Sequence, residues 1–156
     1  MVNVMDAASY VYYRYEKEYS SKIDEMKLHK LLYFAQRESI IQTGEPLFSA
    51  SFYGWRFGPV LKEIREAYAN SSFSPHISGT VVAELNPVMD AVFLGYAGKD
   101  SWSLSRLTHG EISWQNSRVG VPENSNSDRM ISLEDIRADA ERIKNRRDFL
   151  SQMGLS

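Results

Sequence analysis

Hydrophobic residues recur at steps of three and four along much of the chain, which is the spacing of one face of an α-helix. This pattern predicts a first helix over residues 4–18 and a second that begins at residues 21–24 and runs to about residue 42. Gly44 and Pro46 follow the second segment, and both residue types commonly end helices. The apolar face of the second helix is the most regular in the chain, so we expect this helix to be the central one.

The helical pattern is interrupted near residues 48–58, a segment rich in aromatic residues and glycine. Such a segment is typical of a short strand or extended stretch. Helical spacing then returns, and we expect further helices at residues 60–69, 86–98, 101–107, 113–118 and from Ser132 onward. The sequence therefore predicts a mainly α protein, a single compact helical domain over residues 1–156, with about six helices and one short extended or β segment.

Prolines and a serine place the starts of three of these helices. Pro59 and Pro87 suit the first turn of a helix, where a missing N–H group costs nothing, so we expect helices to begin there. Ser113 is expected to cap one further short helix. Residues 70–79 and 120–128 are polar and lack helical spacing, and we expect them to be loops.

Composition limits the classes of function that are open. Eighteen basic and twenty acidic residues give a formal charge of −2, which argues against a protein whose main task is to neutralise phosphates, although a local basic patch is compatible with it. Cysteine is absent, which excludes disulfides, thiol catalysis and cysteine-based zinc sites and fits a reducing compartment. The sequence has no apolar run near the ~20 residues of a membrane span, and residues 1–19 lack the features of a secretory signal. We therefore expect a cytoplasmic protein with no membrane partner.

Motifs for nucleophilic catalysis and for nucleotide binding are missing from the sequence. His109 and Glu111 are the one candidate for chemistry, since a His-x-Glu pair supplies two metal ligands or a base with its orienting acid. A metal site needs a further ligand, and His29 and His76 have no spacing that ties them to this pair. The alternative is that Thr108 and His109 hydrogen-bond the backbone at a helix junction. We expect this alternative, and with it no catalytic residue, no metal and no cofactor.

Two groups of residues are candidates for binding a partner. Lys27 and Lys30 flank the apolar face of the central helix, where they either contact an acidic partner or phosphate, or lay their stems over the edge of the core. Trp55, Arg56 and Phe57 are of the residue types that dominate protein interfaces. Trp55 and Phe57 are two residues apart, however, and in an extended segment both face the same side, where they could belong to the core. The sequence leaves both sets of alternatives open.

Several segments together resemble one known family. Lys27-Leu-His-Lys-Leu-Leu-Tyr-Phe-Ala-Gln36 is similar to the Lys-Leu-x-Lys-Leu-Leu-Tyr-Phe-Ala-Gln helix of the Panacea antitoxin domain. The other similar segments follow in the family's order at residues 44–48, 53–60, 104–111, Trp114, Arg118 and residues 131–136. The chain departs from the family pattern at His29, where a glutamine is typical, and at Ser113, where a proline is usual. Residues 71–85 have no counterpart in the pattern.

The resemblance implies an antitoxin of a type II toxin–antitoxin pair, which neutralises a cognate protein toxin, encoded by an adjacent gene, by binding it directly. Phages and other mobile elements often carry this domain, and its members pair with unrelated toxins. At least one relative acts as an adaptor that hands its toxin to a cellular protease. The alternative function is a DNA-binding regulator of a phage or toxin–antitoxin operon, which the near-neutral charge and the lack of a clear helix-turn-helix argue against.

Residue type and position in the family pattern together predict two sets of residues. The predicted partner-binding residues are Lys27, Lys30, Trp55, Arg56, Phe57 and Arg118. The predicted structural residues of the family motif are Leu31, Leu32, Tyr33, Phe34, Gly58, Pro59, Thr108, His109 and Trp114.

Overall fold

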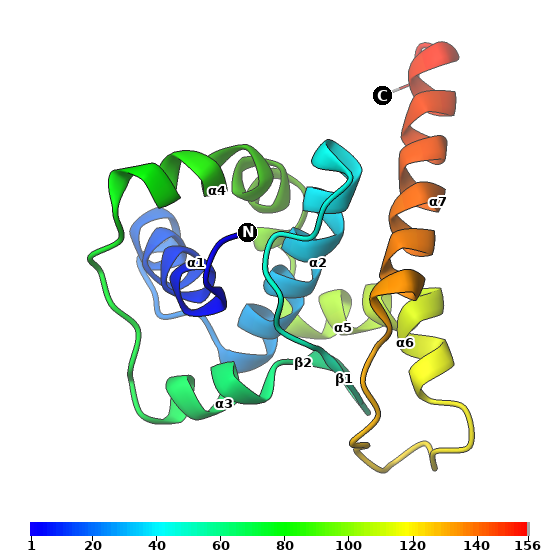
Figure 1. Cartoon of the computed structure of the whole chain (residues 1–156), viewed down its shortest axis with the longest axis horizontal. Helices are drawn as coiled ribbons and strands as arrows, with labels where there is room; N and C mark the ends of the chain where they lie inside the picture. The colour runs from blue at the N-terminus through cyan, green and yellow to red at the C-terminus, as the bar shows by residue number, and fades with distance from the viewer. Residues whose placement is uncertain (156) are drawn as a thin grey trace.

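Helix α2 (Glu25–Thr43) lies at the centre of the molecule, and the other helices pack around it (Figure 1). The structure, a computed structural model, describes residues 1–155 of the chain. The other elements are, in chain order, α1 (Val4–Tyr19), β1 (Tyr53–Trp55), β2 (Gly58–Val60), α3 (Lys62–Ala69), α4 (Gly79–Val92), the π-helical turn η1 (Phe93–Ala97), α5 (Ser101–His109), α6 (Ile112–Ser117) and α7 (Leu133–Gln152). The prediction of a mainly α fold is confirmed, with seven α-helices in the described residues where about six were expected.

Every residue of α2 from Lys27 to Ile40 is buried, because other elements cover this helix on all sides. Helices α1, α4, α5 and α7 pack against it, and so do α3 and β2. Its ends lie close to where the sequence predicts them. The Asp24 side chain accepts the backbone N–H of Lys27 at the start, and Gly44, with a φ of 80°, ends the helix. The polar side chains of α2 therefore have to find partners inside the protein.

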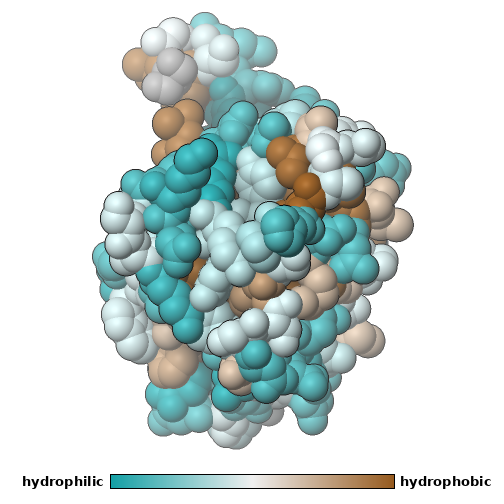
Figure 2. Space-filling model, turned by 90° about the vertical axis from the view of Figure 1, so that its left-hand side faces the viewer, coloured by the Kyte–Doolittle hydropathy of each residue, from teal (hydrophilic) through white to brown (hydrophobic). Residues whose placement is uncertain are grey.

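The helices around α2 form two groups (Figure 1). Helices α1 and α4 pack against α2 and against each other on one side, while α7 packs against α2 and α6 on the other. The C-terminal end of α7 stands clear of the body; the side chains of Phe149 on this helix and of Met153 just after it are exposed. The side of the molecule that lies to the left in Figure 1 is mostly hydrophilic, with separate small hydrophobic patches (Figure 2). Among the described residues, no helix combines the length and the hydrophobicity needed to cross a membrane.

The extended segment predicted near residues 48–58 contains the first half of a β-hairpin. Strands β1 and β2 pair antiparallel, with Trp55 opposite Gly58. Arg56 and Phe57 form the turn between the two strands. Because these two residues lie in a turn, Trp55 and Phe57 do not continue one extended strand, and neither side chain belongs to the hydrophobic core.

The prediction that a helix begins at Pro59 was wrong. Pro59 lies in β2 opposite Gly54, and α3 begins only at Lys62. In the described part of the chain β2 pairs with β1 alone, so one edge of this strand needs no N–H donor and tolerates a proline. Proline fixes φ at a value that both a helix start and an edge strand accept, and the pairing with β1 decides between them.

The prediction that a helix begins at Asn86 and Pro87 was also wrong. Helix α4 begins two turns earlier, at Gly79, where the Ser78 side chain accepts the backbone N–H of Val81. Pro87 lies inside this helix on its exposed side. The energy lost to an interior proline is offset by burial of the apolar face of α4 against its neighbours, which consists of Leu85, Val88, Met89 and Val92.

Gly58 gives a direct test of the hairpin geometry. Its φ of 118° suits glycine, and a Cβ at this position would lie 2.5 Å from Oγ1 of Thr108 and 2.7 Å from Cε of Lys30. We expect Gly58→Ala to lower the free energy of unfolding by about 2 to 3 kcal/mol, measured by urea denaturation. Gly44→Ala is the matched control, because Gly44 also has a positive φ but no atom within 4 Å of its would-be Cβ. Equal losses in the two variants would show that the contacts with Lys30 and Thr108 contribute nothing.

Candidate functional site

The turn of the hairpin lies beside α2, and the two elements enclose a cavity of about 410 Å³. Four of the six predicted partner-binding residues line this cavity: Lys30, Trp55, Arg56 and Phe57. The rest of the lining comes from α2, β2, α3 and the loop before α7, and consists of Glu25, Met26, His29, Val60, Arg65 and Asn126. The structure therefore brings the lysine of the central helix together with the aromatic and basic residues of the hairpin.

Aromatic rings and guanidinium groups alternate around the opening of the cavity. The Arg65 guanidinium lies 5.2 Å from the centre of the Trp55 ring, and the Arg56 guanidinium lies 4.3 Å from the centre of the Phe57 ring. Phe57 makes an edge-to-face contact with Trp102 of α5, with the ring centres 5.1 Å apart. Phe57 and Trp102 are 37% and 55% exposed, so this pair presents hydrophobic surface to solvent. We call Trp55, Arg56, Phe57, Arg65 and Trp102 the hairpin surface.

Lys30 forms the inner wall of the cavity. Its side chain is buried, and its Nζ donates a hydrogen bond of 3.2 Å to the carbonyl oxygen of Pro59. Burial lowers the pKa of Lys30 to about 7, although the charges of Glu25 and Asp24 act in the opposite direction. A lysine in this state gives up its proton near neutral pH.

His29, the neighbour of Lys30 in α2, is held as a neutral imidazole. Its Nδ1 accepts the backbone N–H of Leu61 at 3.2 Å, so Nε2 carries the proton and donates to Glu25 at 3.0 Å. Burial lowers the pKa of His29, which favours this neutral form.

A second cavity of about 330 Å³ lies on the other side of the turn, and Arg56 and Phe57 line both. His109 and Trp114 form a wall of this second cavity, with their rings stacked 4.1 Å apart. The Trp114 Nε1 donates to the carbonyl oxygen of Trp55 at 2.8 Å and so fixes the end of β1 next to the turn. Burial lowers the pKa of His109, and the charges of Lys30 and Arg118 act in the same direction.

Arg118 also lines the second cavity, but its hydrogen bonds go to the backbone. Its guanidinium donates to the carbonyl oxygens of Gly54 and Ser125, at 2.9 and 2.6 Å, and to those of Pro122 and Glu123. These bonds fasten the loop after α6 to the hairpin. Arg118 therefore positions the cavity wall in this structure.

Lys27 lies apart from both cavities. Its Nζ donates to the hydroxyl of Tyr15 at 3.2 Å and to the carbonyl oxygen of Ala97 at 3.1 Å. It is buried between α1, α2 and η1. Of the two lysines in the Lys-Leu-x-Lys pattern, only Lys30 faces the hairpin.

The predicted structural residues lie in or around the core. Leu31, Leu32, Tyr33 and Phe34 are fully or almost fully buried in α2. The Thr108 hydroxyl donates to the carbonyl oxygen of Ser105 at 2.7 Å within α5, whereas Nε2 of His109 is buried and has no hydrogen-bond partner among the described residues.

A model of one protein family matches residues 28–115, which is more than half of the 156-residue chain. The family is described as antitoxin SocA-like, Panacea domain. The chain belongs to this family. The Panacea-domain match runs from α2 into α6 and includes the hairpin and Lys30, while α1 and α7 lie outside it. No curated protein and no solved structure matches the chain.

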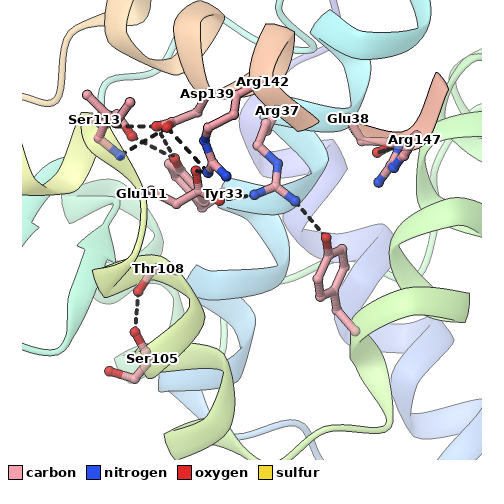
Figure 3. Close-up of polar contacts among 12 residues, drawn as sticks. Tyr33, Arg37, Glu38, Ser105, Thr108, Glu111, Ser113, Asp139, Arg142 and Arg147 are labelled. Atoms are coloured by element: carbon pink, nitrogen blue, oxygen red, sulfur yellow. Dashed lines mark hydrogen bonds and ion pairs between the residues drawn. The ribbon is translucent and has the colours of Figure 1, made fainter. Parts of the chain in front are cut away.

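A buried polar network joins the Panacea-domain segment to α7 (Figure 3). Glu111 forms ion pairs with Arg37 of α2 and, at 3.0 Å, with Arg142 of α7. Burial raises the pKa of Glu111, while Arg37 acts in the opposite direction. Glu111 therefore takes part in an ion-pair network and not in a pair with His109. In the part of the chain that the structure describes, histidines and carboxylates form no group able to hold a metal ion.

Asp139, like Arg37 and Arg142, is a residue of this network that no motif in the sequence singled out. Its side chain is fully buried and accepts the backbone N–H groups of Ile112 and Ser113, each at 2.9 Å. The prediction that Ser113 caps this short helix was wrong, because Asp139 of α7 caps α6 instead and the Ser113 hydroxyl hydrogen-bonds that of Tyr33 at 2.6 Å. The available signal was the position of Asp139, an acid at an apolar spacing between Ile136 and Ala140.

Proposed function

We propose that this protein is the antitoxin of a type II toxin–antitoxin pair and that it neutralises a cognate protein toxin by binding it through the hairpin surface. The Panacea-domain match is the observation that carries the proposal, and the match includes the hairpin and Lys30. The toxin gene lies beside the gene for this chain, on a phage or another mobile element, and the pair acts in the cytoplasm. The antitoxin needs no catalytic step, because occupying the toxin's working surface is enough to stop it.

The hairpin surface has the composition of an interface centre. Exposed aromatic rings and arginines supply much of the binding energy of protein complexes, because they bury large areas and still make directional contacts. Phe57 and Trp102 already pack edge to face, so they lose little conformational freedom when a partner covers them. A specific complex buries about 1,200 Å² or more in total, so the toxin also contacts elements beside the hairpin.

The experiment begins with co-expression of this chain and the product of each neighbouring gene, scored by growth and by pull-down. A neighbour that is toxic alone, harmless with this chain and co-purified with it identifies the toxin. If no neighbour is toxic or bound, the proposed function is wrong.

Substitutions on the hairpin surface then locate the interface. We expect Arg56→Ala and Phe57→Ala each to weaken toxin binding by about tenfold or more, measured by calorimetry on folded variants. Arg146→Ala and Phe149→Ala on α7 are the controls, because both side chains are exposed far from the hairpin. The opposite pattern, with binding lost only in the α7 variants, would move the interface to the C-terminal helix.

A role as adaptor for proteolysis extends this proposal. If the antitoxin hands its toxin to a cellular protease, the half-life of the toxin in cells will shorten when the antitoxin is present. A toxin that is neutralised but equally long-lived would restrict the mechanism to direct inhibition.

A further inference from the structure

Lys30 carries a buried ammonium group that has no anionic partner. The side chain is 1% exposed, and of its three possible hydrogen bonds one is made, to the carbonyl oxygen of Pro59. Lys30 takes part in none of the ion pairs among the described residues. Buried charges are normally paired, because removing an ammonium from water is costly.

The two acids that act electrostatically on Lys30, Glu25 and Asp24, both have other binding partners. The Glu25 carboxylate binds His29 at 3.0 Å and Arg65 at 3.2 Å. The Asp24 carboxylate caps α2 and accepts the Ser101 hydroxyl at 2.7 Å. The Lys30 amine therefore lies at the wall of a cavity, while the nearest carboxylates of the protein bind other groups.

The rest of the cavity suits a negatively charged group attached to a protein chain. Arg56 and Arg65 lie at its lining, and Glu25, the single acid among the lining residues, is already paired. Trp55 and Phe57 give the cavity aromatic walls that pack against the methylene groups of an entering side chain. The volume of about 410 Å³ is at the lower end of the range of binding pockets and admits a single long side chain with water around it.

We propose that this cavity receives an aspartate or glutamate side chain of the toxin, whose carboxylate pairs with the Lys30 ammonium. This inference rests on the proposed function and adds to it the chemistry of the recognised group. An entering carboxylate supplies the counter-charge that Lys30 lacks. The desolvation already imposed on Lys30 in the free antitoxin then adds nothing to the cost of binding.

The test is a double-mutant cycle between the two proteins. Lys30→Met is introduced into the full-length antitoxin, and each exposed Asp and Glu of the toxin is changed to Asn or Gln. We expect Lys30→Met to weaken toxin binding by about 30-fold or more. One toxin variant will show a similar loss, and combining it with Lys30→Met will weaken binding little further. Lys99→Met is the matched control, an exposed lysine whose loss should leave affinity unchanged.

The pH profile of binding separates an ion pair from a packing effect. The charged and titratable groups that face Lys30 are Asp24, Glu25, His29, Arg56, Arg65 and His109. Both histidines have lowered pKa values, so above pH 7 Lys30 is the group among them that changes charge near neutrality. We expect wild-type affinity to fall by about tenfold per pH unit above pH 7, because binding requires Lys30 to take up a proton. In Lys30→Met the affinity should not change over this range.

The outcomes separate this inference from the proposed function. If a neighbouring toxin binds but Lys30→Met binds it equally well, or if none of the toxin's acids couples to Lys30, the carboxylate inference is wrong and the antitoxin function stands. If no neighbouring product binds the wild-type chain, the proposed function is wrong and the inference falls with it.

Discussion

Asp139→Ala is expected to lower the free energy of unfolding by about 3 to 5 kcal/mol. The substitution removes the acceptors of the Ile112 and Ser113 N–H groups, and the Ser113 N–H is then buried without a partner. It also leaves Arg142 with one acid of the two that it approaches, because its distance to Asp139 is 3.8 Å and to Glu111 3.0 Å. Urea denaturation measures the loss, and faster hydrogen exchange at the Ile112 and Ser113 amides would locate it at the start of α6.

Two further variants serve as controls for the size of this stability loss. Asp139→Asn keeps one oxygen as an acceptor and should therefore lose less stability than the alanine variant. Asp148→Ala on the same helix removes an exposed acid paired with Lys144, and should change stability by about 0.5 kcal/mol or less. A loss below about 1 kcal/mol in Asp139→Ala would mean that water replaces the carboxylate at this site.

Lys30→Met is expected to raise the free energy of unfolding near pH 6.5 by about 3 to 4 kcal/mol. Burial lowers the pKa of Lys30 from its ordinary 10.5 to about 7. Each unit of this shift is worth about 1.4 kcal/mol, so the buried charge costs about 5 kcal/mol. The lost hydrogen bond to Pro59 offsets about 1 kcal/mol of the gain. Methionine has a similar length and fills the same space without a charge.

The lowered pKa of Lys30 also predicts how the free energy of unfolding changes with pH. Below pH 7 the lysine is protonated in both the folded and the unfolded chain, and the full cost of burial is present. Between pH 7 and 10.5 the unfolded chain binds the proton and the folded chain does not, so wild-type stability rises with pH. Lys30→Met should lack this rise, and Lys99→Met, the exposed control, should keep it. A methionine variant that is no more stable than wild type at pH 6.5 would contradict the cost assigned to the charge.

The sequence predicts well those elements whose ends depend on neighbouring residues. The start of α2 at Asp24, its end at Gly44 and the start of α7 at Ser132 follow from local hydrogen bonds and backbone geometry. The prediction that helices begin at Pro59 and Pro87 was wrong because residues far away in the sequence determine the structure at both positions. Strand β1 holds Pro59 in a strand, and the burial of one face keeps Pro87 inside α4.

The candidate site likewise has features that the sequence predicts and features that depend on distant elements. Residue type was enough to single out Trp55, Arg56 and Phe57, but it could not show that they surround a turn. Lys27 and Lys30 look alike in the sequence, three residues apart on one helix. They differ in what packs over them, which is α1 and η1 for Lys27 and β2 for Lys30. Such differences arise between elements far apart in the chain, and a single sequence carries no direct signal for them.

The cap that Asp139 provides has a consequence for the evolution of this family. The family model matches this chain up to residue 115, yet the amides at the start of α6 depend on an acid 24 residues beyond that limit. Recombination that exchanges only the shared segment between relatives would separate the helix from its acceptor. Viable exchanges should therefore carry α7 along, so that the heritable unit is longer than the region by which the family is recognised.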